Sequence, residues 1–316
     1  MNKNVQIIDN LCVICIKLIS DYIRQNSIAC GFKTGESWVI LSPIEQSIKA
    51  KIEAVGVPLR DWDIQINYGI KTGYNEAFII DGAKKDELIK QDPKSAEIIR
   101  PILRGRDIKR YSYEFADLYL ITTFPSLKID IEKYPAVKNH LLSFGMERLE
   151  QTGEKYIVNG EGINARKKTN NKWFETQDQI GYWEDFYRQK IVWGEISDKS
   201  KFVLDKTSMF PEATTFLMVG NNLKYLLAML NSKLGEWLFS QIGTTTGVGT
   251  IRWKKYTIEQ FLVKTPTDQE LEKIEKQTEV VLKSATYENI TVLDRLIYDL
   301  YSLSAMEQKY LENESN

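Results

Sequence analysis

Apolar positions in the first part of the chain follow helical spacing. Residues 5–25 place apolar side chains on one face, as an amphipathic helix does, and a second helix is expected from about residue 43 to 54. Gly56 and Pro58 would end that second helix, because glycine and proline terminate helices. The pattern therefore predicts a helical connector over residues 1–58.

Between residues 59 and 220 the pattern changes to short β-prone runs separated by turns. The predicted strands are Ile64–Tyr68, Ala77–Ile80, Leu118–Thr123, Tyr156–Val158, Ile180–Tyr182, Lys190–Trp193, Phe202–Leu204 and Thr214–Val219. Helices are expected among them near residues 84–91 and 130–149. Because strands and helices alternate irregularly, an α+β sheet is favoured over a doubly wound parallel sheet.

Helical spacing returns towards the C-terminus. Residues 221–264 predict a helix and a loop that complete the body, and residues 265–316 predict two or three further helices. The two expected capping boxes are Thr267 with Glu270 and Ser304 with Glu307. The predicted fold is thus α+β: a mixed-sheet domain with an N-terminal helical connector and a C-terminal helical segment.

Charge is distributed unevenly along the chain, although the net charge is only −1. From residue 265 onwards there are five Lys or Arg against eleven Asp or Glu, whereas residues 1–264 carry 37 positive and 32 negative side chains. A mildly basic body with an acidic tail suits a body that faces a polyanion and a tail that faces another partner. Solvated faces give similar imbalances, so charge alone names no partner.

The three cysteines, Cys12, Cys15 and Cys30, all lie near the N-terminus and form no disulfide framework. A reducing, cytoplasmic location is the simple inference. Cys12 and Cys15 have metal-like spacing, but no second pair exists, and their helical spacing is typical of buried small residues. Polar residues interrupt every apolar run, so neither a signal peptide nor a membrane-spanning helix is expected.

Catalytic motifs are missing from the sequence. His140 is the only histidine, and the Gly243–Gly249 loop lacks the lysine that a phosphate-binding P-loop requires. Neither a glycine turn for a methyl donor nor an Asn-Pro-Pro-Tyr loop is present, and Glu307-Gln-Lys309 is interpreted as a chance match to a nuclease motif. We therefore expect no catalytic residue, no metal site and no cofactor in this chain.

Three basic clusters interrupt the body, each beside aromatic residues. They are Arg100, Arg104, Arg106, Lys109 and Arg110 beside Tyr111 and Tyr113; Arg166, Lys167, Lys168, Asn170 and Lys172 beside Trp173; and Arg252, Lys254 and Lys255 beside Trp253 and Tyr256. Lys and Arg neutralise DNA phosphates, and Arg, Asn and Gln read base edges. The alternative is that the aromatic residues anchor loops and the arginines form internal ion pairs, for example with Asp107 or Glu114.

Five segments, in this order, resemble a known family. They are "GIKTGYNEAFIID" (69–81), "IIRPILRGRDIKRY" (98–111), "YLLAMLNSKL" (225–234), "GVGTIRW" (247–253) and "LDRLIYDLYSLSAME" (293–307). The sequence is similar to the TaqI-like C-terminal specificity domain, which supplies target recognition to type IIG restriction–modification enzymes and related adenine-specific DNA methyltransferases. The resemblance covers nearly all residues from 38 to 311.

The resemblance implies a domain that reads the major groove of double-stranded DNA and is followed by helices that pack on a partner. In intact family enzymes an upstream domain binds S-adenosylmethionine and methylates a flipped adenine at N6, and a nuclease, with its Mg²⁺, often precedes it. Lys71, Thr72 and Asn75 join the basic clusters as candidate DNA-binding residues. Gly105 would bring the chain close to the phosphates, while Gly69 and Gly73 are equally explained by a turn between strands.

Our hypothesis from the sequence is a non-catalytic DNA-binding specificity module that acts with a methyltransferase domain or subunit in bacterial restriction–modification. One alternative is the C-terminal part of a complete adenine-specific methyltransferase and endonuclease. The other is an interaction protein that does not bind DNA and whose acidic tail docks a partner.

Overall fold

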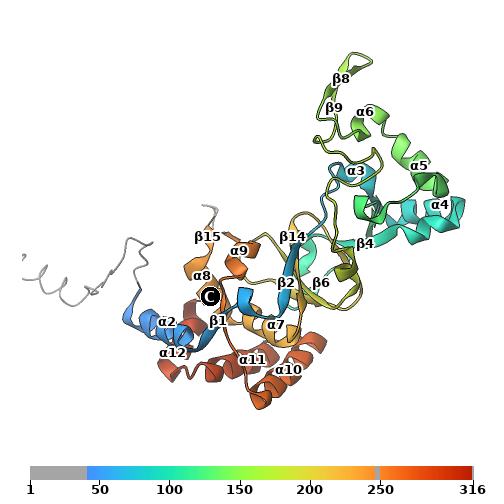
Figure 1. Ribbon diagram of the computed structural model, residues 1–316. Coiled ribbons are helices and arrows are strands. Elements are labelled where there is room, and N and C mark those ends of the chain that lie inside the picture. The colour runs from blue at the N-terminus through green and yellow to red at the C-terminus, as the bar shows by residue number, and fades with distance from the viewer. Residues whose placement is uncertain (1–40, 246–249, 315–316) are drawn as a thin grey trace, which may run out of the picture. The chain divides into compact units, whose positions relative to one another are not determined.

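The computed structural model describes residues 41–245 and 250–314 of the chain (Figure 1). The chain divides into two compact units, residues 1–50 and residues 51–316. The described part of the first unit contains the start of helix α2 (Pro43–Val55), as predicted. The helix predicted over 5–25, the cysteine residues and the Gly-rich residues 246–249 lie outside the described residues. The domain boundaries expected at residues 58, 220 and 264 stay predictions.

Helices dominate the C-terminal third of the described chain. The helices after α2 are α3 (Asn75–Phe78), α4 (Gly82–Gln91), α5 (Pro135–Leu142), α6 (Met146–Leu149), α7 (Leu223–Asn231), α8 (Lys233–Ile242), α9 (Lys255–Ile258), α10 (Asp268–Lys283), α11 (Tyr287–Leu300) and α12 (Ala305–Glu314). Both predicted capping boxes form: Thr267 with Glu270 starts α10, and Ser304 with Glu307 starts α12. Within the described ranges, no helix is both long and apolar enough to cross a membrane.

The strands are short and form several small sheets. They are β1 (Gly56–Pro58), β2 (Ile64–Tyr68), β3 (Ile79–Asp81), β4 (Ile99–Leu103), β5 (Ile108–Lys109), β6 (Ser112–Tyr113), β7 (Leu118–Ile121), β8 (Lys155–Val158), β9 (Glu161–Asn164), β10 (Lys190–Gly194), β11 (Ile196–Ser197), β12 (Phe202–Asp205), β13 (Phe210–Pro211), β14 (Thr215–Gly220), β15 (Thr244–Thr245), β16 (Ile251–Arg252) and β17 (Leu262–Lys264). The predicted α+β class is confirmed, including a mixed sheet and C-terminal helices.

Two four-stranded sheets build the body of the second unit. The first has the order β12-β10-β14-β2 with antiparallel neighbours throughout, and the second has the order β13-β4-β7-β3. The second sheet is mixed, because β13 runs parallel to β4 while the other pairs are antiparallel. Smaller pairings join β1 to β17, β11 to β16 and β15, β5 to β6, and β8 to β9.

One apolar core lies between the two large sheets. It takes Val192 and Leu217 from the antiparallel sheet and Ile102 and Leu120 from the mixed sheet, all almost fully buried. Phe210 on β13 joins it and packs against the aromatic rings of neighbouring turns, with its ring centroid 4.9 Å from that of Phe186. The shared core holds the loops of both sheets in a fixed relation.

A buried ion pair fixes the edge of the antiparallel sheet. Lys190 on β10 lies opposite Asp205 on β12, with Nζ 2.6 Å from Oδ2 and both side chains fully buried. The Asp205 carboxylate also accepts hydrogen bonds from the amides of Thr207 and Met209. Burial lowers the pKa of Lys190, and the carboxylate opposes that shift. The pair thus fixes the β10–β12 register and the turn that follows.

Several local predictions are wrong. Ala77 and Phe78 end helix α3 instead of starting a strand, because a short buried apolar run fits either element. Residues 180–182 form no strand, since Ile180 has a φ of +50°. The single helix expected at the start of residues 221–264 is two helices, α7 and α8, because the hydroxyl of Ser232 caps α8 by accepting from the amide of Gly235. Strand β4, within the first basic cluster, was not predicted.

A polar joint connects the sheets to the C-terminal helices. Arg110, after β5, donates to the carbonyl of Asn231 at the end of α7, and its guanidinium lies 3.8 Å from the carboxylate of Asp294 on α11. Asp294 also accepts from the amide of Lys233 at 3.1 Å, which is the first residue of α8. Burial raises the pKa of Asp294 to about 6, although Arg110 opposes the rise.

The raised pKa of Asp294 predicts a pH dependence of stability. Because its pKa is higher in the folded than in the unfolded protein, folding favours the protonated carboxyl, and the free energy of unfolding should fall as the pH rises from about 4 through 6. The full effect is at most about 3 kcal/mol. Asp294→Asn should remove it, measured by urea unfolding at pH 4.5 and 7.5. Asp299→Asn, at an exposed position of the same helix, is the control, and an unchanged pH dependence in Asp294→Asn would contradict the assignment.

Candidate nucleic-acid interface

Most cations of the first basic cluster form hydrogen bonds or ion pairs with other groups of the same chain. The guanidinium of Arg104 forms a two-pronged ion pair with Asp107, at 2.7 and 2.9 Å, within the turn Gly105–Asp107. Arg100, on β4, donates to the hydroxyl of Tyr187 and to carbonyls of residues 96, 97 and 99. Lys109 pairs with Glu114 at 2.7 Å at the surface. With Arg110 in the polar joint, four of the five cations have partners.

Arg106 is the exception in this cluster. Its side chain is exposed and makes no hydrogen bond or ion pair with any residue that the structure describes. The turn that carries Arg106 packs against strand β10 at Gly105. A Cβ on Gly194 of β10 would lie only 3.3 Å from the Cα of Gly105. The close packing of these two backbones favours glycine at both positions, and the expected approach of Gly105 to DNA phosphates stays a prediction.

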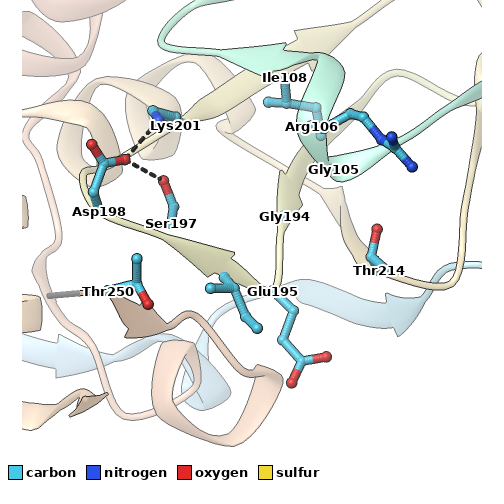
Figure 2. A pocket seen from close by; sticks show the side chains of 11 residues that line it. Gly105, Arg106, Ile108, Gly194, Glu195, Ser197, Asp198, Lys201, Thr214 and Thr250 are labelled. Atoms are coloured by element: carbon cyan, nitrogen blue, oxygen red, sulfur yellow. Dashed lines mark hydrogen bonds and ion pairs between the residues drawn. The ribbon is translucent and has the colours of Figure 1, made fainter. Parts of the chain in front are cut away.

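Arg106 borders a cleft of about 410 Å³, which is lined by the turn at Gly105 and Arg106 and by residues 194–198. Figure 2 shows Ser197, Asp198 and Lys201 at one end of this cleft and Arg106, Glu195 and Thr214 at the other. Asp198 accepts from Lys201 at 2.6 Å, and the carboxylate of Glu195 lies 3.3 Å from the guanidinium of Arg252. Arg252, from the third basic cluster, is therefore paired with Glu195, a residue that lines the same cleft as Arg106.

The two lysines of the third cluster are both half-buried and differ in their contacts. Lys255 donates to the carbonyl of Ile66 on β2 at 2.8 Å and is thereby tied to the sheet. Lys254 is half-buried, with its ammonium 5.9 Å from the ring centroid of Tyr256. Trp253 is buried and stacks on Phe239 with ring centroids 3.8 Å apart, so it anchors the segment to the helices.

Arg166, in the second cluster, is buried to 1% exposure and acts as a structural centre. Its guanidinium donates to the carbonyl oxygens of Leu149, Thr72, Trp173 and Glu175. It also lies over the ring of Phe78, 5.0 Å from its centroid. Burial lowers the pKa of Arg166 to about 10, so the group stays charged at neutral pH.

The turn at residues 69–75 is held by this centre. Thr72 is buried, and its hydroxyl donates to the side-chain oxygen of Asn75 at 2.6 Å. Gly73 has a φ of +80°, which favours glycine, and a Cβ there would lie in tight contact with the side chain of Arg166, at 3.1 Å. Lys71 points outwards from the turn, exposed and without a hydrogen bond from its ammonium to any described residue.

The segment after Arg166 supplies most of the exposed charge. Lys167, Lys168 and Lys172 are exposed, and so is Asn170. The ammonium of Lys172 lies 5.5 Å from the ring centroid of Phe174, whereas Lys167 and Lys168 have no ion pair with the described part of the chain. Because Gln177 donates its amide to the carbonyl of Lys71, this segment and the turn at 69–75 are neighbours.

The sequence predicted the first strand of the hairpin that borders this surface, at Tyr156–Val158, but missed its second strand. Strands β8 and β9 form a hairpin around Asn159 and Gly160, a dipeptide that favours such turns. Figure 1 shows the hairpin near α6, with α3 and α5 on the same side of the unit. Arg148 on α6 was also missed: it donates to the carbonyl of Asn164 and lies over the ring of Tyr74 at 4.2 Å.

Comparison with known proteins identifies the family of the chain. A family model described as the TaqI-like C-terminal specificity domain matches residues 100–263, which is more than half of the chain. The chain therefore belongs to this family of specificity domains. The predicted resemblance is confirmed.

Individual relatives are distant. The type II methyltransferase M.PaeR7I of Pseudomonas aeruginosa is 20% identical over 280 residues, which cover 87% of this chain and 45% of the relative. The solved structure of the type IIL restriction–modification enzyme MmeI in complex with DNA has a TM-score of 0.55 at 13% identity, over 78% of this chain and 34% of that chain. For the type IIG restriction endonuclease BpuSI the values are 0.47, 12%, 81% and 33%. The chain thus spans less than half of the length of each, and the likeness to MmeI is one of fold.

Arg166 provides a test of the framework behind this surface. Arg166→Met removes the donors of four interior carbonyl oxygens, and we expect the free energy of unfolding to fall by about 3 kcal/mol or more. Lys167→Met, a neighbouring exposed cation, should change it by less than about 0.5 kcal/mol. Urea unfolding of both variants measures the difference, and equal effects would show that Arg166 is not the structural centre.

Proposed function

We propose that this chain is the DNA target-recognition module of a type IIG-like restriction–modification system. The family match over residues 100–263 carries the proposal, because it identifies a specificity domain. The exposed cations around the Arg166 centre support it, since phosphate binding needs positive side chains that the protein does not already use. The module would bind double-stranded DNA and direct adenine-N6 methylation, with or without cleavage.

The chemistry would come from a methyltransferase domain or subunit. The sequence carries neither a glycine turn for S-adenosylmethionine nor an Asn-Pro-Pro-Tyr loop for a flipped adenine. His140, the only histidine, is half-buried, with Nε2 3.0 Å from the carbonyl oxygen of Ala77, and burial lowers its pKa. S-adenosylmethionine, and Mg²⁺ for any nuclease, would therefore be held by the partner.

The exposed and the internal cations have different roles in this proposal. Lys71, Lys167, Lys168 and Arg106 would contact the DNA directly. The side chains of Arg100, Arg104, Arg110, Arg166, Lys255 and Thr72 would act indirectly, by holding the loops in place. Phosphate contacts fix the register of a protein on the duplex, and base contacts supply the sequence.

An interaction protein is the second candidate. The acidic C-terminal helices expose Tyr287 at the start of α11 to 78% and Met306 on α12 to 76%. Large apolar side chains at such exposure are typical of a surface that meets another protein. In the proposed module the same helices would face the methyltransferase part, so this observation fits both candidates, and only DNA binding separates them.

The test of the proposed function is a fluorescence-anisotropy titration of the full chain with a randomised duplex across a salt series. Affinity should fall by roughly 10³-fold between 50 and 200 mM salt for about six phosphate contacts. Replacing both Lys167 and Lys168 by Ala should reduce the slope of log affinity against log salt by about 2.

The matched control replaces Lys273 and Lys276 by Ala. These two lysines are exposed on α10, within the acidic tail, and their removal changes the net charge equally. If both double variants change the slope alike, the effect is one of net charge and not of a phosphate-binding surface. Absence of duplex binding at every salt concentration would contradict the proposed function and favour the interaction protein.

A further inference from the structure

A small polar hollow lies beside the exposed lysines of the second cluster, and the proposed function assigns it no role. Its volume is about 310 Å³. It is lined by Glu150, Gln151, Thr152, Thr169, Asn170, Asn171 and Trp173. A hollow rich in amides and hydroxyls beside an indole is chemically suited to the edge of a nucleobase.

Two of the three amides in this hollow are fully used by the protein. The side chain of Gln151 donates to the carbonyls of Lys172 and Glu175, at 3.1 and 2.9 Å, and accepts from the hydroxyl of Thr169 at 2.9 Å. The side chain of Asn171 donates to the carbonyls of Thr176 and Gln177 at 3.1 and 2.9 Å and accepts from Gln179. These amides hold the loop, and because both N–H donors of each are used, neither can donate to a base while accepting from it.

Asn170 sits between these fixed points. The amide of Thr169 donates to the carbonyl of Gln151 at 3.0 Å, the amide of Asn171 to the hydroxyl of Thr169 at 3.1 Å, and that of Lys172 to the carboxylate of Glu175 at 2.7 Å. The backbone on both sides of Asn170 is therefore held. Its own side chain is exposed and makes no hydrogen bond to the residues that the structure describes.

We infer that Asn170 is a specificity-determining residue that reads an adenine in the DNA target, an inference that rests on the proposed function. A free asparagine amide accepts from N6 of adenine and donates to its N7 at the same time. The exposed Lys168 and Lys172, two residues away on either side, would bind the phosphates next to that base. The amide of Asn170, carried on a held backbone between two lysines, keeps both of its hydrogen bonds for the base.

The other exposed asparagine among the predicted site residues is less suited to this role. The side-chain oxygen of Asn75 already accepts from the hydroxyl of Thr72 at 2.6 Å, so its acceptor is engaged by the protein. Arg106, the exposed arginine at the cleft, offers only donors and would contact guanine or phosphate. The geometry therefore assigns adenine reading to Asn170.

The test begins with selection of bound duplexes from a randomised pool by the full chain, followed by the same selection with Asn170→Ala and Asn170→Asp. Asn170→Ala should lose preference at one adenine position while the rest of the motif persists, and affinity for the selected duplex should fall roughly 10- to 100-fold. Asn170→Asp should move the preference at that position from adenine towards cytosine, whose N4 donates to a carboxylate. Asn139→Ala, at an exposed asparagine of α5, is the control and should leave the motif unchanged.

Replacing that adenine by 7-deazaadenine provides a test at the level of one atom, because the analogue lacks N7. The wild-type chain should bind the analogue duplex more weakly than the natural one, while Asn170→Ala should bind both equally. If wild type and Asn170→Ala lose the same affinity, or if Asn170→Ala selects the wild-type motif, the inference is wrong although DNA recognition stands. If the wild-type chain binds no duplex and selects no motif, the proposed function and the inference both fail.

Discussion

The buried guanidinium of Arg166 is the interaction on which the candidate interface depends. It donates to carbonyl oxygens of Thr72, Leu149, Trp173 and Glu175, which come from three separate segments of the chain. A buried cation is stable only when its donors are satisfied, and here four backbone carbonyl oxygens accept from the guanidinium. Because the three segments meet on one planar group, the turn at 69–75 and the loop after Arg166 cannot move independently.

Internal hydrogen bonds and ion pairs likewise occupy most cations of the first basic cluster. Arg100, Arg104 and Arg110 each bind carbonyl or carboxylate groups of the protein, although all three lie in a stretch that reads as a phosphate-binding surface. Partnered cations of this kind position loops, whereas Lys71 and Arg106 keep their charge at the surface. A specificity domain needs both kinds, since base reading demands loops that are rigid before DNA arrives.

The C-terminal helices are part of the same framework. Arg110 links the turn after β5 to the end of α7 and to Asp294 on α11, so the acidic tail and the sheets share a buried polar contact. The desolvation of Asp294 is only partly offset by Arg110, which is why its carboxyl favours protonation. The packing of the C-terminal helices on the sheets therefore depends in part on one ionisable contact.

The sequence by itself determined the α+β class, all four strands of the antiparallel sheet β12-β10-β14-β2, both C-terminal capping boxes and the family, because these follow from local periodicity and from motifs in order. It placed Arg166 and Asn170 in the same basic cluster but could not separate their roles. Only the tertiary structure decided that Arg166 is buried by residues up to 94 positions away and that Asn170 faces solvent. The physical reason is that burial and hydrogen-bond satisfaction depend on segments brought together by folding, which neighbouring residues in the sequence do not encode.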